Sequence, residues 1–217
     1  MKHAVIFDMD GVIVDSERQW VQSEASFLKQ AIPDWSAEDF DKITGMGVKD
    51  LYQFLKSEYE FPYSWEQFWE RNEQAGHTVY EEMVNLIPGF LPLAFALKKE
   101  VALGLASSSP RSWIKIVLDR FSLTELFESV VSADDVQGRS KPAPDIYLYA
   151  ARVLGVDPQF CLAIEDSHHG ALSAKRAGMK VLGFRNGFNG GQDLSVADTI
   201  IDGFEGRNLD SLLKLFE

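Results

Sequence analysis

From residue 88 onward, the sequence alternates short apolar runs with longer amphipathic stretches, and this alternation restricts the possible folds more than any other feature. It is typical of parallel strands joined by helices. The apolar runs are VALGLA (101–106), SVVS (129–132), FCLAI (160–164), KVLGF (180–184) and DTII (198–201), together with AVIF (4–7) near the start. Helices are expected at about 90–99, 111–121, 145–154, 169–177 and 209–216. The pattern predicts an α/β fold with a Rossmann-like parallel sheet.

Residues 16–86 have a different pattern, with strong helical signals and no convincing strand. In SERQWVQSEASFLKQ (16–30), one stripe at helical spacing contains Trp20, Val21, Phe27 and Leu28. The aromatic residues farther along are expected in the core of a helical bundle: Phe61, Tyr63, Trp65, Phe68 and Trp69. We therefore predict an α/β core domain, residues 1–15 and 87–217, that is interrupted by an inserted helical domain, residues 16–86.

The first apolar run leads directly into an acidic stretch, FDMDGVIVDSE (7–17). Alternate side chains of a strand share a face, so Asp8 and Asp10 would lie roughly 6–7 Å apart and repel each other. A bound cation, or a proton on one of them, would relieve this repulsion, and both arrangements are used in catalysis. The alternative is structural, because Asp10-Gly11 is also an ordinary turn signal with a solvated acid.

Other polar residues lie at or near the strand ends, on the edge where open α/β sheets bind ligands. They are Ser107, Ser108 and Ser109 after 101–106, Lys141 before a helix, and Glu165, Asp166 and Ser167 after 160–164. Each group also has a structural interpretation. The serines and the acids can cap the helices that follow them, and Lys141 can be a solvated loop residue. The convergence of all these groups on one edge favours a functional site.

Chemically, these residues indicate phosphoryl transfer. Carboxylates without cysteine or histidine form a hard oxygen site that suits Mg2+. A lysine, serine hydroxyls and backbone amides at the start of a helix suit the oxygens of a phosphate group. One acid near the metal can attack phosphorus, while its neighbour acts as general acid and base.

The motifs DMDGV (8–12), ASS (106–108), KPAPD (141–145) and EDS (165–167) resemble, in this order, those of the haloacid dehalogenase superfamily, in the branch with a helical cap inserted after the first motif. The resemblance implies that Asp8 is the nucleophile, which forms an aspartyl-phosphate, and that Asp10 protonates the leaving group and then activates water. It also implies that phosphate is held by Ser107, with Ser108 beside it, and by Lys141. The implied Mg2+ ligands are Asp8, Asp10 through its backbone carbonyl, Glu165 and Asp166.

Within this superfamily, the chain resembles both sugar phosphatases and β-phosphoglucomutases. The mutases have a histidine where this chain has Trp20, and a basic loop where it has Thr44, Gly45, Met46, Gly47 and Val48. The glycines of this loop either end a helix or let the backbone at Gly45, Met46 and Gly47 approach a substrate.

The loop itself contains no cation, and Lys49 is the only one directly adjacent to it in the sequence, which argues against the binding of a second phosphate. We therefore expect a phosphatase that acts on a small phosphorylated metabolite, such as a sugar phosphate. One alternative is a sugar-phosphate mutase. Another is a non-enzymatic phospho-acceptor of the receiver type, which has no use for a helical lid or for a second acid at Asp10.

Composition narrows the choice of partners. A net charge of −12 argues against nucleic acid, and no apolar run is long enough to span a membrane. The chain starts with a short strand instead of a targeting peptide, so a cytoplasmic protein is expected. Cys161, the single cysteine, is expected to be a buried structural thiol. The expected partner is a small phosphorylated metabolite, bound by a monomer.

Overall fold

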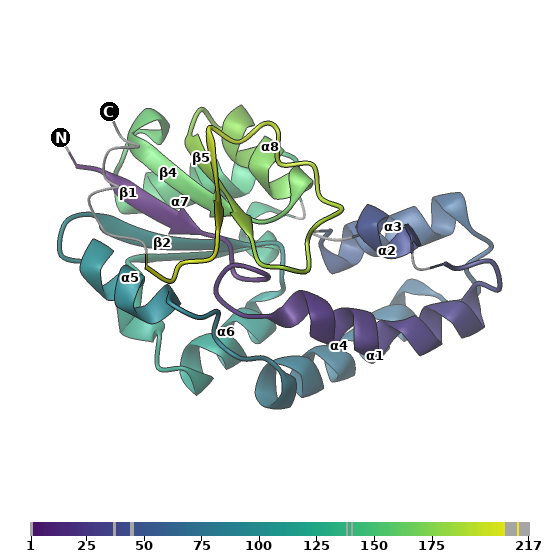
Figure 1. Ribbon diagram of the computed structural model, residues 1–217. Coiled ribbons are helices and arrows are strands. Elements are labelled where there is room, and N and C mark those ends of the chain that lie inside the picture. The colour runs from purple at the N-terminus through teal and green to yellow at the C-terminus, as the bar shows by residue number, and fades with distance from the viewer. Residues whose placement is uncertain are drawn as a thin grey trace.

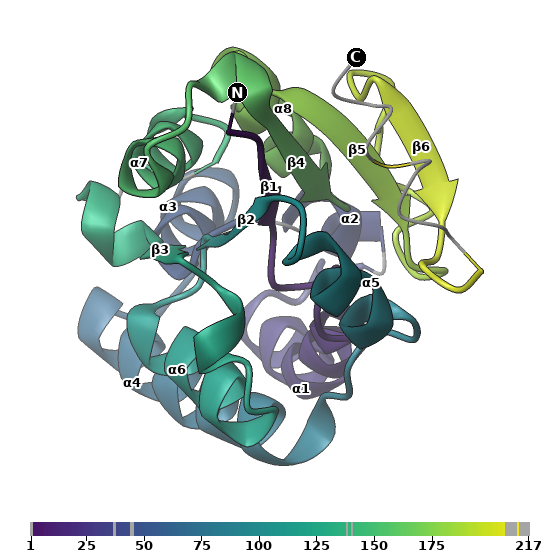
Figure 2. The same ribbon diagram turned by 90° about the vertical axis from the view of Figure 1, so that its left-hand side faces the viewer.

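The computed structural model describes residues 2–36, 38–43, 46–137, 139, 141–206 and 212. Within these residues, six strands form one parallel sheet in the order β3-β2-β1-β4-β5-β6 (Figures 1 and 2). They are β1 (Ala4–Phe7), β2 (Ala102–Ser107), β3 (Ser129–Ser132), β4 (Cys161–Glu165), β5 (Lys180–Arg185) and β6 (Thr199–Asp202). Each strand coincides with one of the apolar runs, so the predicted α/β fold with a parallel sheet is confirmed.

Helices cover both faces of this sheet. α5 (Phe90–Leu97) and α6 (Arg111–Arg120) pack on one face, and α7 (Asp145–Leu154) and α8 (His168–Arg176) pack on the other (Figure 2). Alternate residues of β1 contribute to the two cores, so the strand is buried on both sides. These four helices begin and end within two residues of the predicted positions. The helix expected at 209–216 lies outside the described residues, except for residue 212.

Short helical turns connect several of these elements: η2 (Thr124–Leu126), η3 (Ala133–Val136) and η4 (Pro158–Phe160). Cys161, at the start of β4, is buried as expected, and its Sγ lies 3.5 Å from the carbonyl oxygen of Asp157. Among the helices of the described ranges, none has both the length and the apolar character that a membrane span requires.

Between β1 and α5, the chain forms a separate group of helices beyond the carboxyl end of β1 (Figure 1). They are α1 (Ser16–Ala31), α2 (Glu38–Ile43), α3 (Val48–Glu58), α4 (Trp65–Thr78) and the π-helical turn η1 (Val79–Met83). This helical region has its own core, in which Leu28, Leu55, Phe61 and Phe68 are buried. A helical insertion after the first strand, as predicted, is therefore present.

The individual apolar residues of the helical region have different neighbours. Tyr63 and Trp65 pack against its core, in line with the predicted aromatic cluster. On α1, Leu28 lies in this core, whereas Trp20 packs against the core that α5 and α6 form with the sheet. Val21 was predicted to share their stripe, but its side chain is 41% exposed, because it borders the cavity described below.

The chain enters and leaves the helical region through two segments that pair with each other. The backbone N–H of Asp15 donates to the carbonyl of Asn85 (3.0 Å), and that of Ile87 donates to the carbonyl of Ile13 (2.9 Å). The Asp15 carboxylate also accepts a hydrogen bond from the backbone N–H of Asn85 (2.5 Å). The helical region is thus joined to the sheet through one paired connection, next to the acids that follow β1.

Candidate functional site

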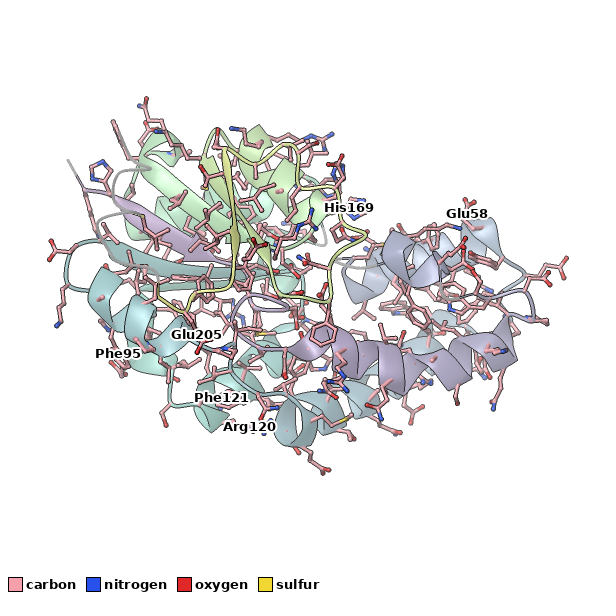
Figure 3. All side chains as sticks on the ribbon, viewed as in Figure 1. Glu58, Phe95, Arg120, Phe121, His169 and Glu205 are labelled. Carbon is pink, nitrogen blue, oxygen red and sulfur yellow. The ribbon has the colours of Figure 1, made fainter. Side chains whose placement is uncertain are left out.

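The polar residues singled out in the sequence lie at the carboxyl ends of β1, β2 and β4, on the side of the sheet turned toward the helical region. His169, in the first turn of α8, lies on this side, whereas Phe95 and Glu205 lie farther from the helical region (Figure 3). Ser107 ends β2, Glu165 ends β4 and Asp8 follows β1. Since β1 pairs with both β2 and β4, the three strands end side by side and bring Asp8, Ser107 and Glu165 together.

Lys141 is the centre of a buried ion-pair network at this edge. Its Nζ lies 2.7 Å from Asp8 Oδ1, 2.6 Å from Glu165 Oε1 and 3.0 Å from the carbonyl oxygen of Ala106. Tyr147 donates a further hydrogen bond to Glu165. Lys141 is only 4% exposed, so its interpretation as a solvated loop residue is wrong. Burial by itself would lower the pKa of Lys141, but the charges of Asp8 and Glu165 outweigh this effect and raise it.

Asp8, Glu165 and Asp166 form a buried group of carboxylates whose oxygens lie within 4.8 Å of one another. Burial raises the pKa of Asp8 well above its usual value, and Glu165 and Asp10 raise it further, while Lys141 offsets only part of the rise. Burial and the neighbouring carboxylates also raise the pKa of Asp166. A set of oxygen ligands with this excess of negative charge fits a hard divalent cation.

Asn186 and Gly11, which were not predicted as site residues, lie next to Asp166. The side-chain amide of Asn186 lies 3.0 Å from Asp166 Oδ2, 2.9 Å from Glu17 Oε2 and 3.0 Å from the carbonyl oxygen of Gly11. Gly11 has a φ of +71°, and a Cβ at this position would lie 2.0 Å from Asp166 Oδ2. Glycine is therefore required at position 11. Asn186 directly follows β5, so a search of every strand end would have found it.

Asp10 is surrounded by hydroxyl groups. Ser16 Oγ and Tyr80 OH each donate to Oδ1 at 2.6 Å, and Ser109 Oγ donates to Oδ2 at 2.7 Å. Burial, followed by the charge of Asp10, raises the pKa of Tyr80 well above its usual value, so Tyr80 is a neutral donor. Trp20 Nε1 in turn donates to Tyr80 OH (3.1 Å). Tyr80 belongs to η1, 70 residues from Asp10 in the sequence, and no local pattern identifies it.

The serines after β2 face the site and do not cap α6, whose first backbone N–H, that of Arg111, donates instead to the carboxylate of Asp134 (2.9 Å). Ser107 Oγ accepts a hydrogen bond from the backbone N–H of Ser109 (3.0 Å) and lies 3.4 Å from Asp10 Oδ2. Ser108 Oγ is buried and has no hydrogen-bond partner within the described parts of the chain, so it is available to a ligand. Ser167 does cap α8, as its structural interpretation requires, by accepting from the backbone N–H of Gly170 (3.1 Å).

A cavity of about 140 Å³ lies between this edge of the sheet and the helical region. The sheet side contributes Asp8, Asp10, Ser108, Lys141, Asp166 and Ser167. The helical side is mostly apolar and includes Trp20, Val21, Phe40, Ile43, Met46, Gly47, Val48 and Leu51. Among the described residues that line the cavity, Lys141 is the only lysine or arginine.

The predicted site residues take different positions relative to this cavity. Met46 and Gly47 lie in its helical wall, and Gly45 lies outside the described residues. Ser107 and Glu165 are fully buried and are not part of the cavity surface. Glu165 therefore contacts the site through its ion pair with Lys141 and through its neighbouring carboxylates, Asp8 and Asp166.

A second cavity, of about 400 Å³, adjoins the first and shares Gly47, Val48 and Ser108 with it. Trp69, which was predicted for the helical core, lines this cavity beside Trp65, with ring centroids 5.7 Å apart. Lys49 also lines this second cavity and not the first.

Similar proteins are known by family, sequence and fold. Residues 5–184 match the family model described as haloacid dehalogenase-like hydrolase. Hexitol phosphatase B of Escherichia coli K12 is 35% identical over 188 residues, which cover 82% of this chain and 81% of the relative. Phosphorylated carbohydrates phosphatase of Thermotoga maritima is 30% identical over 199 residues, which cover 91% and 92%. The crystal structure of β-phosphoglucomutase from Clostridium difficile has a TM-score of 0.81 at 24% identity, over 100% of this chain and 97% of that chain, which indicates a shared fold.

Proposed function

This chain belongs to the haloacid dehalogenase-like hydrolase family, and from this premise we propose that it is a Mg2+-dependent phosphatase that hydrolyses a small phosphorylated carbohydrate through an aspartyl-phosphate on Asp8. The position of Asp8 carries the proposal. Its carboxylate lines the cavity, lies 2.7 Å from Lys141 and belongs to the group of three carboxylates. A nucleophile, a phosphate-binding cation and metal-binding oxygens are thus within reach of a single phosphoryl group.

The reaction has two steps. In the first, an oxygen of Asp8 attacks phosphorus, the bond from phosphorus to the ester oxygen breaks, and the leaving alkoxide takes a proton from Asp10. In the second, water attacks phosphorus and gives a proton to Asp10, and the bond between Asp8 and phosphorus breaks. The products are an alcohol and inorganic phosphate, and the enzyme returns to its starting protonation state.

The surrounding residues hold these two acids and the phosphoryl group in place. Lys141 and the free hydroxyl of Ser108 are suited to bind the phosphoryl oxygens, and Ser107 supports them from behind the cavity wall. Tyr80 and Ser16 fix the carboxylate of Asp10 through hydrogen bonds of 2.6 Å.

The three carboxylates of Asp8, Glu165 and Asp166 fit a divalent metal ion, because they offer only oxygen ligands and carry more negative charge than Lys141 balances. We propose that Asp8, Glu165, Asp166 and the backbone carbonyl of Asp10 hold this ion. Mg2+ bound there would offset the repulsion between the carboxylates and stabilise negative charge on the phosphoryl oxygens.

Hydrolysis is favoured over phosphate transfer within a sugar. A mutase has to hold a second phosphate group while its aspartyl-phosphate is protected from water. Among the described residues that line the cavity, Lys141 is the one cation. Trp20 and Val48 give its helical side an apolar surface, and Lys49 lies in the neighbouring cavity. A leaving group without a second phosphate suits these walls better than a bisphosphate.

The two phosphatase relatives support a carbohydrate substrate. Those relatives are named for hexitol phosphates and phosphorylated carbohydrates. We therefore propose a monophosphate of a sugar or sugar alcohol.

A phosphate-release assay tests this function. Wild-type protein and the Asp8→Asn variant are incubated with sugar and sugar-alcohol monophosphates, nucleotides and flavin mononucleotide, with Mg2+ or with a chelator. We expect the wild type to release phosphate from carbohydrate monophosphates only with Mg2+, and Asp8→Asn to be inactive. A folded, Mg2+-supplied wild type that releases no phosphate from any carbohydrate monophosphate would contradict the proposal.

The proposal includes the domain organisation inferred from the sequence, with residues 1–15 and 87–217 as the catalytic core and residues 16–86 as the cap. It is supported by the paired connection at Asp15 and Asn85, which joins the two parts. A monomeric, cytoplasmic enzyme also remains a prediction.

A further inference from the structure

Glu24 is a buried acid in the cavity wall that the proposed reaction does not use. It lies on α1, one turn beyond Trp20, and is only 4% exposed to solvent. Within the described parts of the chain, the cation that contacts it is Arg71 on α4, with Nη1 3.4 Å from Glu24 Oε1. Arg71 is partly exposed, and its guanidinium carbon lies 3.6 Å from the ring centroid of Phe27. This contact compensates poorly for the burial of a carboxylate.

Asn72, the neighbour of Arg71 on α4, is the second buried polar side chain of the same wall. It is 2% exposed, and its amide nitrogen donates to the carbonyl of Phe68 (2.9 Å). This bond uses one hydrogen of the side-chain amide. The other hydrogen and the oxygen are therefore the groups that Asn72 can offer to a molecule in the cavity.

The remaining polar groups on the helical side are already engaged with the catalytic machinery. Ser16 and Tyr80 donate to Asp10, and Glu17 accepts from Asn186 beside Asp166. The rest of that wall is apolar, so a hydroxyl group placed against it would lose its hydrogen bonds to water without compensation. Glu24 and Asn72 are the positions where such a hydroxyl group finds a partner.

We propose that Glu24 and Asn72 are specificity-determining residues that bind hydroxyl groups of the leaving group. This inference rests on the proposed phosphatase function and adds that the cap wall selects uncharged, polyhydroxylated leaving groups over apolar ones of the same size. A substrate that lacks the hydroxyl group leaves the buried Glu24 or Asn72 side chain without a hydrogen-bond partner. This loss costs binding free energy and so disfavours that substrate.

The test compares two substrates of similar size, a hexose or hexitol monophosphate and cyclohexyl phosphate, in wild type, Glu24→Leu, Glu24→Gln and Asn72→Leu. Leucine removes the polar partner, and we expect it to lower kcat/KM for the carbohydrate substrate roughly 10- to 100-fold. The value for cyclohexyl phosphate should stay the same or rise. Glu24→Gln keeps the shape and one acceptor, so its loss should be smaller. Glu58→Gln, an exposed acid at the end of α3, is the matched control and should leave both values unchanged.

If Glu24→Leu does not fold, the ratio of kcat/KM for the carbohydrate substrate to kcat/KM for cyclohexyl phosphate can still be measured in Asn72→Leu and Glu24→Gln. A ratio that stays at the wild-type value in the folded variants would overturn the inference but leave the phosphatase function intact. An equal loss for both substrates would also overturn it, because that result indicates a structural role. Absence of any phosphatase activity in the wild type would instead overturn the proposed function, and the inference with it.

Discussion

Asp8 and Asp10 are two positions apart, yet they have different surroundings, and we propose different roles for them. Asp8 is buried against Lys141, whereas Asp10 accepts hydrogen bonds from hydroxyl groups. Asp8→Asn should abolish turnover and the covalent phosphoenzyme, because the amide is a poor nucleophile. Asp10→Asn should keep the nucleophile but slow hydrolysis of an alkyl phosphate roughly 10²- to 10⁴-fold, since the leaving alkoxide then lacks its proton donor.

Rapid-quench trapping of phosphoenzyme, together with steady-state rates, distinguishes the two variants. The loss in Asp10→Asn should be smaller for p-nitrophenyl phosphate, whose leaving group departs without a proton. Full steady-state activity of Asp8→Asn would contradict the assignment of the nucleophile.

Tyr80 is expected to position Asp10. In Tyr80→Phe, Asp10 loses a hydrogen bond of 2.6 Å, and the indole N–H of Trp20 loses its acceptor. We expect the free energy of unfolding to fall by about 1–3 kcal/mol. We also expect kcat for an alkyl phosphate to fall more than kcat for p-nitrophenyl phosphate. Tyr52→Phe is the control, because Tyr52 OH only donates to the carbonyl of Tyr63 at 3.3 Å. Equal effects on both substrates would argue for a purely structural role of Tyr80.

Glu24 should also affect stability in a pH-dependent way. Burial raises the pKa of Glu24 from its usual 4.5 to about 7, although Arg71 opposes the rise. Between these values the folded protein keeps a proton that the unfolded chain has lost, so stability falls as pH rises and the full penalty applies above pH 7. At 1.36 kcal/mol per pKa unit, this penalty is about 3 kcal/mol.

Denaturant unfolding of wild type and Glu24→Gln at pH 5 and pH 8 measures this penalty. Glutamine cannot ionise, so the stability of Glu24→Gln relative to wild type should increase from pH 5 to pH 8, by at most about 3 kcal/mol. Other titrating groups cancel in this difference. A stability difference that does not change with pH would show that Glu24 does not titrate between these values.

For single residues, the sequence predicted most of the groups that follow strands, together with Met46 and Gly47 of the helical region. It missed Asn186 after β5, and Tyr80 in η1. Asp8, Asp10, Lys141 and Asp166 gather at the sheet edge because parallel strands end together. Tyr80 could not be found from the sequence, because its contact with Asp10 depends on how η1 packs against α1 and α6.

Among the elements, the turn after β1 places the strictest demand on the sequence. Gly11→Ala combines a positive φ with a Cβ 2.0 Å from the Asp166 carboxylate, so we expect a loss of stability and a higher Mg2+ requirement. Gly155→Ala is the matched control, with a φ of +66° and no atom within 4 Å of the added Cβ. Thermal unfolding and Mg2+ titration of activity compare the two. The same Mg2+ dependence in both variants would contradict the role assigned to Gly11.

The helices and strands of the core were predictable because each has a clear period and a distinct start or end. The bounds of α7 agree with the prediction, and those of α5, α6 and α8 differ from it by at most two residues. The π-helical turn η1 has no comparable pattern. It follows α4 directly, and it packs against α1 and α6, which lie far from it in the sequence.

In the whole molecule, which has a net charge of −12, we expect an anionic substrate to be held by the buried Lys141 and by a metal ion on the neighbouring carboxylates. The sheet and the inserted helices were predictable from periodicity. The character of the cavity was not, since its wall combines residues of α1, α2, α3 and α4 with the sheet edge. This wall supports hydrolysis without phosphate transfer within the sugar.

Phosphorus-31 NMR distinguishes hydrolysis from phosphate transfer within the sugar. The enzyme is mixed with Mg2+, β-glucose 1-phosphate and a trace of glucose 1,6-bisphosphate, and in parallel with a hexitol phosphate. We predict that inorganic phosphate is the product that accumulates, with no rapid build-up of glucose 6-phosphate. Fast conversion of β-glucose 1-phosphate to glucose 6-phosphate that depends on the bisphosphate would contradict the account and identify the protein as a mutase.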